Sequence, residues 1–322
     1  MQIRSENIIK RKINCKFILI SLMTIFLLFL IGCGGPNNSI NTNQSSNLIG
    51  GTVDPDPNQI SETGDLNLKV HFLDVGQADA ILIQLPNSQT MLIDAGNNDD
   101  GTIVVAYLKQ QGVQTIDYLI GTHPHEDHIG GLDNVIRNFN ISQIYLPKIT
   151  NTTKTYEDVL LAIKAKGLKI TTAQAGKKII DQNNLQADFV APVGSKYESL
   201  NNWSVVTKVQ YEDTTFIFAG DAEAEAEVEM LASGVSLKAD VLKIGHHGSR
   251  TSSSMPFLKA VSPMYTVISV GKGNDYGHPH PETLSKLSQL GIPVYRTDLF
   301  GNLEFISDGQ NIAIKTMGKQ MK

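Results

Sequence analysis

The sequence His123-Pro124-His125-Glu126-Asp127-His128 places three imidazoles and two carboxylates in six residues. It directly follows the apolar run Ile116-Asp117-Tyr118-Leu119-Ile120, which is typical of a buried strand. Imidazole nitrogen and carboxylate oxygen are ligands for Zn, Mn and Fe. A loop at the end of a strand can direct its first two histidines to one ion, and its Asp and last His to a neighbouring one. Two adjacent ions indicate hydrolysis. The alternative is an exposed polar loop with accidental histidines.

The N-terminus predicts an export signal. Basic residues from Arg4 to Lys16 precede the apolar run 17–31, which is short for a membrane span but suits a signal peptide. The run ends in Leu30-Ile31-Gly32-Cys33, which resembles the bacterial lipobox. We expect residues 1–32 to be removed, and acyl chains on Cys33 to hold the protein outside the cell on its membrane. The alternative is an ordinary anchor helix with a chance Cys.

Composition limits the function classes. Removing 32 of the 322 residues leaves 290, a usual length for one α/β hydrolase, and a hydrophobic content of 41% can bury a core. The removed segment contains five basic residues and Glu6, so the remainder has 22 basic against 31 acidic residues, a formal charge of −9. This balance argues against a general nucleic-acid binder. Bound cations could still reverse the local field for a polyanionic substrate.

Two further segments complete the domain organisation. Residues 33–65 are rich in Asn, Ser, Gly and Pro without apolar periodicity, which predicts a flexible tether. The hydrolase domain then covers residues 66–322. The chain has two cysteines, Cys15 and Cys33, so this domain has none. Its site must therefore use nitrogen and oxygen ligands.

Strand and helix patterns alternate along the domain. We expect strands at residues 68–75, 80–85, 90–94, 116–120, 143–146, 205–211, 215–218, 239–244 and 265–270, and helices at 102–111, 156–166, 222–232 and 281–289. Hairpins mixed with strand–helix units favour sheet layers covered by helices.

An internal similarity divides the domain in two. Asp117 to His123 and Asp240 to His246 both run from Asp through an apolar strand to His, and a hairpin and a helix precede each. If the halves pack about a pseudo-twofold axis, His123 and His246 emerge at one end of the sheets, where open α/β sheets bind ligands. Chance is the alternative, because such loose matches are common.

The motifs together resemble a known family. HPHEDH is similar to the HxHxDH signature of the metallo-β-lactamase superfamily. The chain resembles in particular the C-terminal hydrolase domain of ComEC-type competence proteins, without their transmembrane portion. The resemblance covers residue 68 to about residue 314. It implies an α/β fold, a four-layer αββα sandwich with two similar halves. The motifs that carry it are LDVGQADAILIQ, MLIDAG, THPHEDHIGG, FAGDAEAEAE, LKIGHHGSRTSS and YGHPHPE.

The resemblance also implies roles for individual residues. His123 and His125 would bind the first of two divalent ions, Zn or Mn, and Asp127, His128 and His246 the second. Asp221 would bridge both ions, although it also suits a helix N-cap. Asp94 would orient a metal-bound His, with a turn-forming Asp as the alternative. Asp127 or Asp221 would help to orient the attacking water.

The sequence departs from the superfamily at one position. Most members supply a third His to the first metal about twenty residues before the bridging Asp, but residues 200–205 contain none. Asn202, Ser204 or water would replace it, and an oxygen-richer site suits Mn better. The departure makes β-lactam hydrolysis less favoured.

The remaining polar residues have weaker assignments. His278 and His280 resemble the late motif of the family, and we favour His278 as a proton donor to the leaving oxygen or as a metal ligand. His247, Ser249 and Arg250 could position an anionic substrate or form a plain loop.

The sequence therefore predicts a metal-dependent hydrolase, with a phosphodiester bond as the favoured target and single-stranded DNA outside the cell as the candidate substrate. Hydrolysis of a thioester, lactone or lactam and a non-catalytic surface-binding lipoprotein are the alternatives. The membrane is reached through the lipid anchor, and no protein partner is predicted.

Overall fold

Two mixed β-sheets lie face to face in residues 66–318, the part of the chain that the computed structural model describes. The predicted signal peptide, lipidated Cys33 and tether lie outside the described residues. The first sheet has the strand order β15-β14-β1-β2-β3-β4-β5-β6 and the second β13-β12-β11-β10-β9-β8-β7. The first sheet consists of β1 (Leu68–Phe72), β2 (Ile81–Gln84), β3 (Thr90–Ile93), β4 (Thr115–Ile120), β5 (Asn140–Pro147), β6 (Ile170–Ala173), β14 (Leu303–Ser307) and β15 (Ile312–Thr316). The second consists of β7 (Lys178–Asp181), β8 (Leu185–Ala191), β9 (Val206–Tyr211), β10 (Thr214–Phe218), β11 (Val241–Lys243), β12 (Tyr265–Ile268) and β13 (Val294–Arg296).

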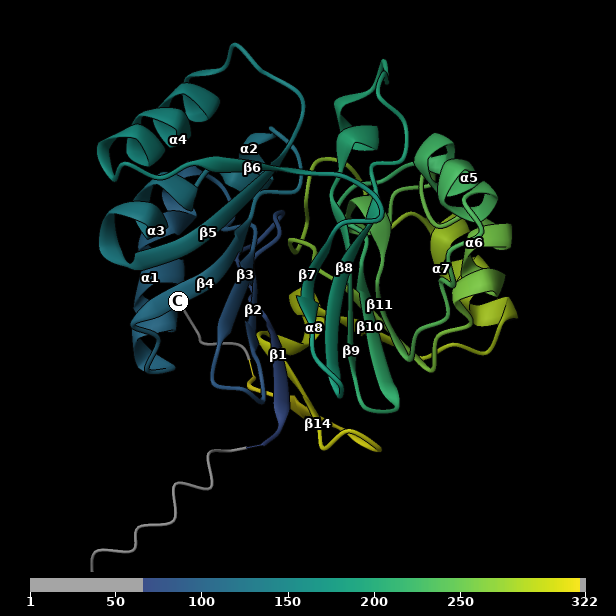
Figure 1. Cartoon of the computed structure of the whole chain (residues 1–322). Coiled ribbons are helices and arrows are strands. Elements are labelled where there is room, and N and C mark those ends of the chain that lie inside the picture. The colour runs from purple at the N-terminus through teal and green to yellow at the C-terminus, as the bar shows by residue number, and fades with distance from the viewer. Residues whose placement is uncertain (1–65, 319–322) are drawn as a thin grey trace, which may run out of the picture. The chain divides into compact units, whose positions relative to one another are not determined.

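Helices cover the outer faces of both sheets (Figure 1). The helices beside the first sheet are α1 (Gly101–Gln110), α2 (Glu126–Ile129), α3 (Leu132–Asn138) and α4 (Lys154–Ala165), and those beside the second are α5 (Ala224–Ala232), α6 (Met255–Val261) and α7 (Pro281–Gln289). Short elements in the connections are α8 (Thr297–Phe300) and the 3₁₀ turns η1 (Asn98–Asp100), η2 (Leu200–Trp203) and η3 (Gly245–Gly248). These layers confirm the predicted αββα sandwich. Within the described range, no helix combines the length and the apolar character that crossing a bilayer requires.

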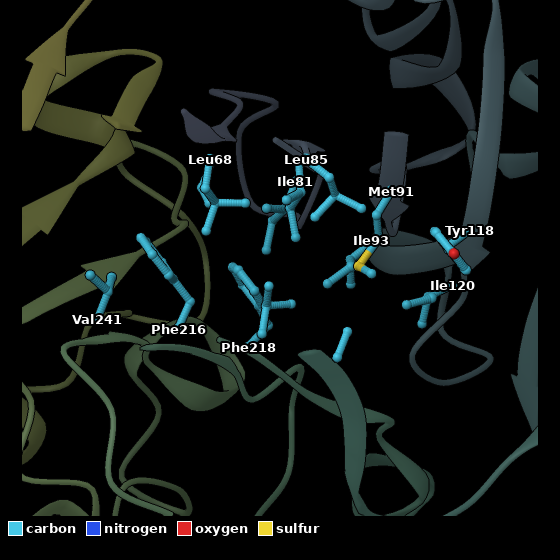
Figure 2. Packing of buried hydrophobic residues seen from close by; sticks show 14 of the residues in the cluster. Leu68, Ile81, Leu85, Met91, Ile93, Tyr118, Ile120, Phe216, Phe218 and Val241 are labelled. Atoms are coloured by element: carbon cyan, nitrogen blue, oxygen red, sulfur yellow. The ribbon is translucent and has the colours of Figure 1, made fainter. Parts of the chain in front are cut away.

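The main core lies between the two sheets. Phe72 of β1 packs against Phe218 of β10 and Phe305 of β14, with ring centroids 6.1 Å and 5.6 Å away. Figure 2 shows side chains of both sheets meeting there, including Ile93 and Phe218. Fully burying a side chain of this size contributes about 1.5–3 kcal/mol. Two further cores pack each sheet against its helices. Strands buried on both faces explain why the sequence shows near-continuous apolar runs.

The two halves share one strand arrangement. From β1 to β6, the neighbouring pairs are antiparallel, antiparallel, parallel, parallel and parallel, and β8 to β13 repeat this series. The same hydrogen bond marks both copies: Thr90 N donates to Asp117 Oδ2 over 2.8 Å, and Thr215 N donates to Asp240 Oδ2 over 2.7 Å. The predicted similarity of the halves is therefore a property of the fold.

Candidate metal centre

The loop after β4 supplies the first half of the site. His123 and His128 are buried, whereas Asp127 is partly exposed. Helix α2 follows within the same connection after β4 and lies directly against the loop after β3. This close approach depends on glycine, because a Cβ at Gly130 would lie 2.3 Å from the backbone carbon of Asn97. The sequence after the histidines thus fixes where their loop packs.

The second half of the site follows β10 and β11. Asp221 comes three residues after β10, and His246 and His247 lie in η3 after β11. Both histidines have a φ of 50°, in the left-handed region that side chains other than glycine rarely adopt. Strained backbone of this kind is concentrated at functional sites. The turn buries His247 and leaves His246 partly exposed.

Four ligand-type side chains from both halves form a tight group. One atom each of Asp127, His128, Asp221 and His247 lies within 4.8 Å of the others. His128 Nε2 is 3.2 Å from Asp221 Oδ2, and His247 Nε2 is 3.2 Å from Asp127 Oδ2. The group lies at the carboxyl ends of β4, β10 and β11, as expected for ligand sites of open α/β sheets.

Asp221 also faces the remaining predicted ligands. Its Oδ2 is 3.9 Å from His123 Nε2 and 3.7 Å from His246 Nε2. His123 Nε2 is in turn 2.9 Å from His125 Nδ1. Four of the other five predicted ligands, His123, Asp127, His128 and His246, therefore lie near the Asp221 carboxylate, and the fifth, His125, is next to His123. His247 Nε2 lies 3.2 Å from Asp127 Oδ2 and 3.7 Å from Asp221 Oδ1, so His247 is a further candidate for the role predicted for its neighbour His246; metal binding by each residue stays a prediction.

Two buried atoms in this group lack hydrogen-bond partners among the described residues. They are Asp221 Oδ1 and His128 Nε2, the latter with Asp221 Oδ2 3.2 Å away but outside hydrogen-bond geometry. Buried polar atoms normally have a partner, and a bound ion is one recognised explanation when the protein supplies none. Imidazole and carboxylate are also the donor set that Zn and Mn accept. The residues present therefore fit a divalent cation.

The charges of the group compensate one another. Burial opposes ionisation of Asp221, but His128 and His247 outweigh it and hold the pKa of Asp221 well below its usual range. Burial also opposes a charged His128, yet Asp221, Asp127 and Asp94 raise the pKa of His128 well above its ordinary value. Burial lowers the pKa of His123 and of His125. Metal ligation requires deprotonated ligands, so a cation would replace the proton that His128 holds.

Asp94 orients His128 from behind. Its Oδ2 accepts a hydrogen bond from His128 Nδ1 over 2.8 Å and another from Thr122 Oγ1 over 2.7 Å, while Oδ1 accepts from Thr122 N over 2.8 Å. A proton fixed on Nδ1 leaves Nε2 directed at Asp221. This is the contact that the predicted orienting role of Asp94 requires.

A buried ion pair supports the site and was missed by the sequence analysis. Lys243 is fully buried in β11, and its Nζ lies 2.5 Å from Asp79 Oδ2. Asp79 Oδ1 is 3.5 Å from His247 Nδ1, and Asp79 Oδ2 is 3.8 Å from His128 Nδ1. The available signal was a lysine inside the apolar run Val241-Leu242-Lys243-Ile244. Lysine is almost never fully buried unless paired.

Residues 200–205, which lack the expected third His, contact the site and its surroundings through Asn202 and Ser204. Asn202 Oδ1 accepts a hydrogen bond from Glu223 N over 3.0 Å, and its amide donates to Glu225, so this side chain is engaged with the start of α5. Ser204 Oγ lies 3.3 Å from His123 Nδ1 and accepts from Asp221 N over 3.0 Å. Ser204 thus touches the outer nitrogen of His123, a position that suits orienting this residue.

A cavity of about 300 Å³ opens over the group. Its lining comprises Gln77, His125, Glu126, Asp127, Asp221, His246, His247, Tyr276 and His278. His278 is therefore brought to the site. Burial, together with His246 and His247, lowers the pKa of His278 to about 4. At neutral pH this imidazole is uncharged.

The other predicted residues of the C-terminal motifs, Ser249, Arg250 and His280, lie outside the lining of the cavity. Arg250 N donates to His280 Nδ1 over 3.0 Å, so His280 is engaged with backbone. Ser249 is buried, its Oγ is 3.0 Å from Thr251 Oγ1 and its carbonyl accepts from Thr283 Oγ1 over 2.9 Å. Arg250 itself is exposed. None of Ser249, Arg250 and His280 lines the cavity.

Curated proteins of three bacteria are similar to this chain. ComE operon protein 3 of Bacillus subtilis is 30% identical over 254 residues, which is 74% of this chain and 33% of that protein. Competence protein ComA of Neisseria gonorrhoeae is 31% identical over 260 residues, covering 80% and 34%. Recombination protein 2 of Haemophilus influenzae is 29% identical over 240 residues, covering 73% and 28%. The chain thus spans about a third of the length of these relatives.

A family model agrees with the fold and with the arrangement of the site. The model described as the metallo-beta-lactamase superfamily matches residues 73–272, which include the histidine loop after β4, Asp221 and η3. The chain therefore belongs to the metallo-β-lactamase superfamily and is a metal-dependent hydrolase.

Proposed function

We propose that this protein is a phosphodiesterase that uses two divalent cations to cleave single-stranded nucleic acid outside the cell membrane. The observation that carries the proposal is the convergence of nitrogen and oxygen ligands from both halves on the buried carboxylate of Asp221. His123 and His125 would hold one cation, and Asp127, His128 and His247 the other, with Asp221 between them.

The chain itself would hold and orient the reacting groups. When bound, the cations would supply water activation at neutral pH and neutralise negative charge on a phosphoryl group. Asp127 is partly exposed toward the cavity, so its carboxylate can orient a water there. Asp94 and Asp79 lie behind His128 and keep its Nε2 directed at the centre. No nucleophilic Ser or Cys is required.

The lining of the cavity favours a phosphodiester over the alternative bonds. A thioester, lactone or lactam needs an apolar pocket, and apolar walls are usual in small-molecule sites. Here the lining consists of His, Asp, Glu and Gln side chains with Tyr276, and contains no aliphatic side chain. Such a polar, ligand-rich surface suits a hydrated, negatively charged phosphate, provided that cations offset the carboxylates.

Two observations, one from the relatives and one from the sequence, support the proposed substrate and the proposed location. The names of two relatives contain the words competence and recombination, which fit a nucleic-acid substrate. The lipobox-like Leu30-Ile31-Gly32-Cys33 supports attachment to the outer face of the membrane. The acidic charge of the chain argues against broad electrostatic binding of DNA. Recognition would depend on the cations at the site.

The test compares three substrates with the purified full chain. We expect metal-dependent cleavage of single-stranded DNA and of bis(p-nitrophenyl) phosphate, and no cleavage of nitrocefin. His123→Ala and Asp127→Ala should each lower phosphodiesterase activity by about 100-fold or more. Asp213→Asn, which changes an exposed carboxylate in the turn between β9 and β10, is the control and should leave activity unchanged. Activity that survives both substitutions at the centre would refute the proposal.

A further inference from the structure

Two loops from opposite halves of the fold meet at the rim of the cavity. Gln77 lies between β1 and β2, and His278 lies between β12 and α7. Both side chains line the cavity. Gln77 Nε2 is 3.3 Å from His278 Nδ1, and Gln77 Oε1 is 3.1 Å from Gly271 N. One amide therefore joins a backbone group and an imidazole of the second half.

The backbone contact fixes which way this amide points. A peptide N–H can only donate, so the Gln77 atom that faces Gly271 N must be the oxygen. The amide nitrogen then faces His278 Nδ1, and an amide nitrogen has no lone pair to offer as acceptor. His278 Nδ1 must therefore accept. In a neutral imidazole the proton then resides on Nε2.

Contacts with the surrounding backbone hold the two loops in this relative position. A Cβ at Gly271 would lie 2.7 Å from Gln77 N, so only glycine permits this approach without a shift. On the other side, Asn274 Oδ1 accepts from His278 N over 3.0 Å and Asn274 Nδ2 donates to His278 O over 2.7 Å. Both partners of the Gln77–His278 hydrogen bond are thus held by residues of the loop between β12 and α7, Gln77 by Gly271 and His278 by Asn274.

We propose that Gln77 is a positioning residue that holds His278 as the neutral Nε2–H tautomer, so that His278 donates a hydrogen bond to the leaving oxygen of the substrate. The alternative role of His278 as a metal ligand through Nδ1 is excluded while Gln77 occupies that nitrogen. Among the described residues, no protein group accepts a hydrogen bond from His278 Nε2, which leaves this donor for a bound substrate. The nature of that substrate rests on the proposed phosphodiesterase function.

Nuclear magnetic resonance tests the tautomer without any substrate. Long-range proton–nitrogen spectra of the full, metal-loaded chain with ¹⁵N-labelled histidine should show His278 protonated on Nε2, with the signal assigned by its loss in His278→Gln. Gln77→Glu places an acceptor at Nδ1, so the proton should move to Nδ1. Gln84→Glu is the control. It makes the same change next to another histidine, His71, at the end of β2 away from Gln77, and should leave the tautomer of His278 unaltered. Wild-type His278 protonated on Nδ1 would overturn the proposal, even if a Gln77 variant failed to fold.

Kinetics test what the tautomer does. An alkoxide leaves with difficulty and depends on a hydrogen-bond donor, whereas p-nitrophenolate leaves readily without one. Gln77→Glu should therefore lower kcat on a dinucleotide by about tenfold or more, and lower kcat on bis(p-nitrophenyl) phosphate much less. An equal loss on both substrates would indicate a merely structural role and contradict the proposal. If neither substrate is cleaved, the phosphodiesterase function fails, whereas the tautomer measurement still decides the role of Gln77.

Discussion

Asp94 Oδ2 accepts a hydrogen bond from His128 Nδ1 over 2.8 Å, and both side chains are completely buried. The pair connects the end of β3 to the centre of the site. Asp94→Asn replaces the acceptor that fixes the His128 tautomer. We expect metal affinity to fall by about 10–100-fold, the usual cost of losing such an orienting partner. Titration of the apo-protein with Zn and Mn measures it, and unchanged affinity would contradict the orienting role.

The neighbouring histidines of η3 offer a direct comparison. His247 meets Asp127 and Asp221, whereas His246 is partly exposed and also faces Glu223. We expect His247→Ala to reduce bound metal per chain and His246→Ala to retain more of it. Elemental analysis of both variants at matched metal concentration decides between them. Greater metal loss in His246→Ala would restore the ligand set predicted from the sequence.

Lys243 and Asp79 should show strong coupling in stability. Lys243→Met leaves the Asp79 carboxylate buried without its cationic partner, which should lower the free energy of unfolding by about 3–5 kcal/mol. Adding Asp79→Leu removes the uncompensated charge, so the double variant should be more stable than Lys243→Met alone. Urea unfolding of the wild type, both single variants and the double variant measures the coupling. Additive effects would show that the pair does not interact.

Much of the fold was predictable because the central strands are apolar on both faces. Tyr118 and Ile120 of β4 face the core between the sheets, and Leu119 faces the helices, so the run stands out in the sequence. Strands β7 and β15 were missed because they are edge strands in which most side chains are exposed or partly exposed. Strand β14 was missed because its pairing with β1 joins residues more than 200 positions apart, such as Leu68 and Ser307.

The site was predictable where one motif carries several ligands, as from His123 to His128. The site was not predictable where the backbone conformation decides which of two adjacent residues points into it. Nothing in the sequence His246-His247 tells which ring is buried, because the left-handed φ of both residues sets their directions. Gln77, Asp79 and Lys243 were missed for another reason: they act through partners in the other half of the fold.

The buried carboxyl of Glu227 should make stability depend on pH. Burial raises the pKa of Glu227 above its ordinary value of 4.5, although it accepts hydrogen bonds from Ser253 N and Ser254 N. The folded chain then binds more protons than the unfolded chain between these two pKa values, so this group's contribution to stability falls as pH rises through that window. The unfolding free energy of the wild type minus that of Glu227→Gln, measured by urea unfolding at several pH values, should decrease as pH rises between these two pKa values. Glu282→Gln, an exposed residue of α7, should show no such trend.

Lipid attachment is tested at Cys33. Cys33→Ser removes the predicted acyl acceptor, so the protein should no longer incorporate labelled palmitate and should move from the membrane fraction to the soluble fraction. Cys15→Ser, within the predicted signal peptide, should change neither property. Palmitate incorporation that survives Cys33→Ser would contradict the lipobox interpretation.

The central claim is a two-cation centre organised around Asp221, and the metal content of the full chain tests it most directly. Elemental analysis of the wild type, purified with Zn or Mn present, should give about two ions per chain, and Asp221→Asn should lose most of this metal together with single-stranded DNA cleavage. Asp213→Asn should retain both. A wild-type chain that binds no metal, or an Asp221→Asn variant that binds and cleaves as the wild type does, would contradict the account.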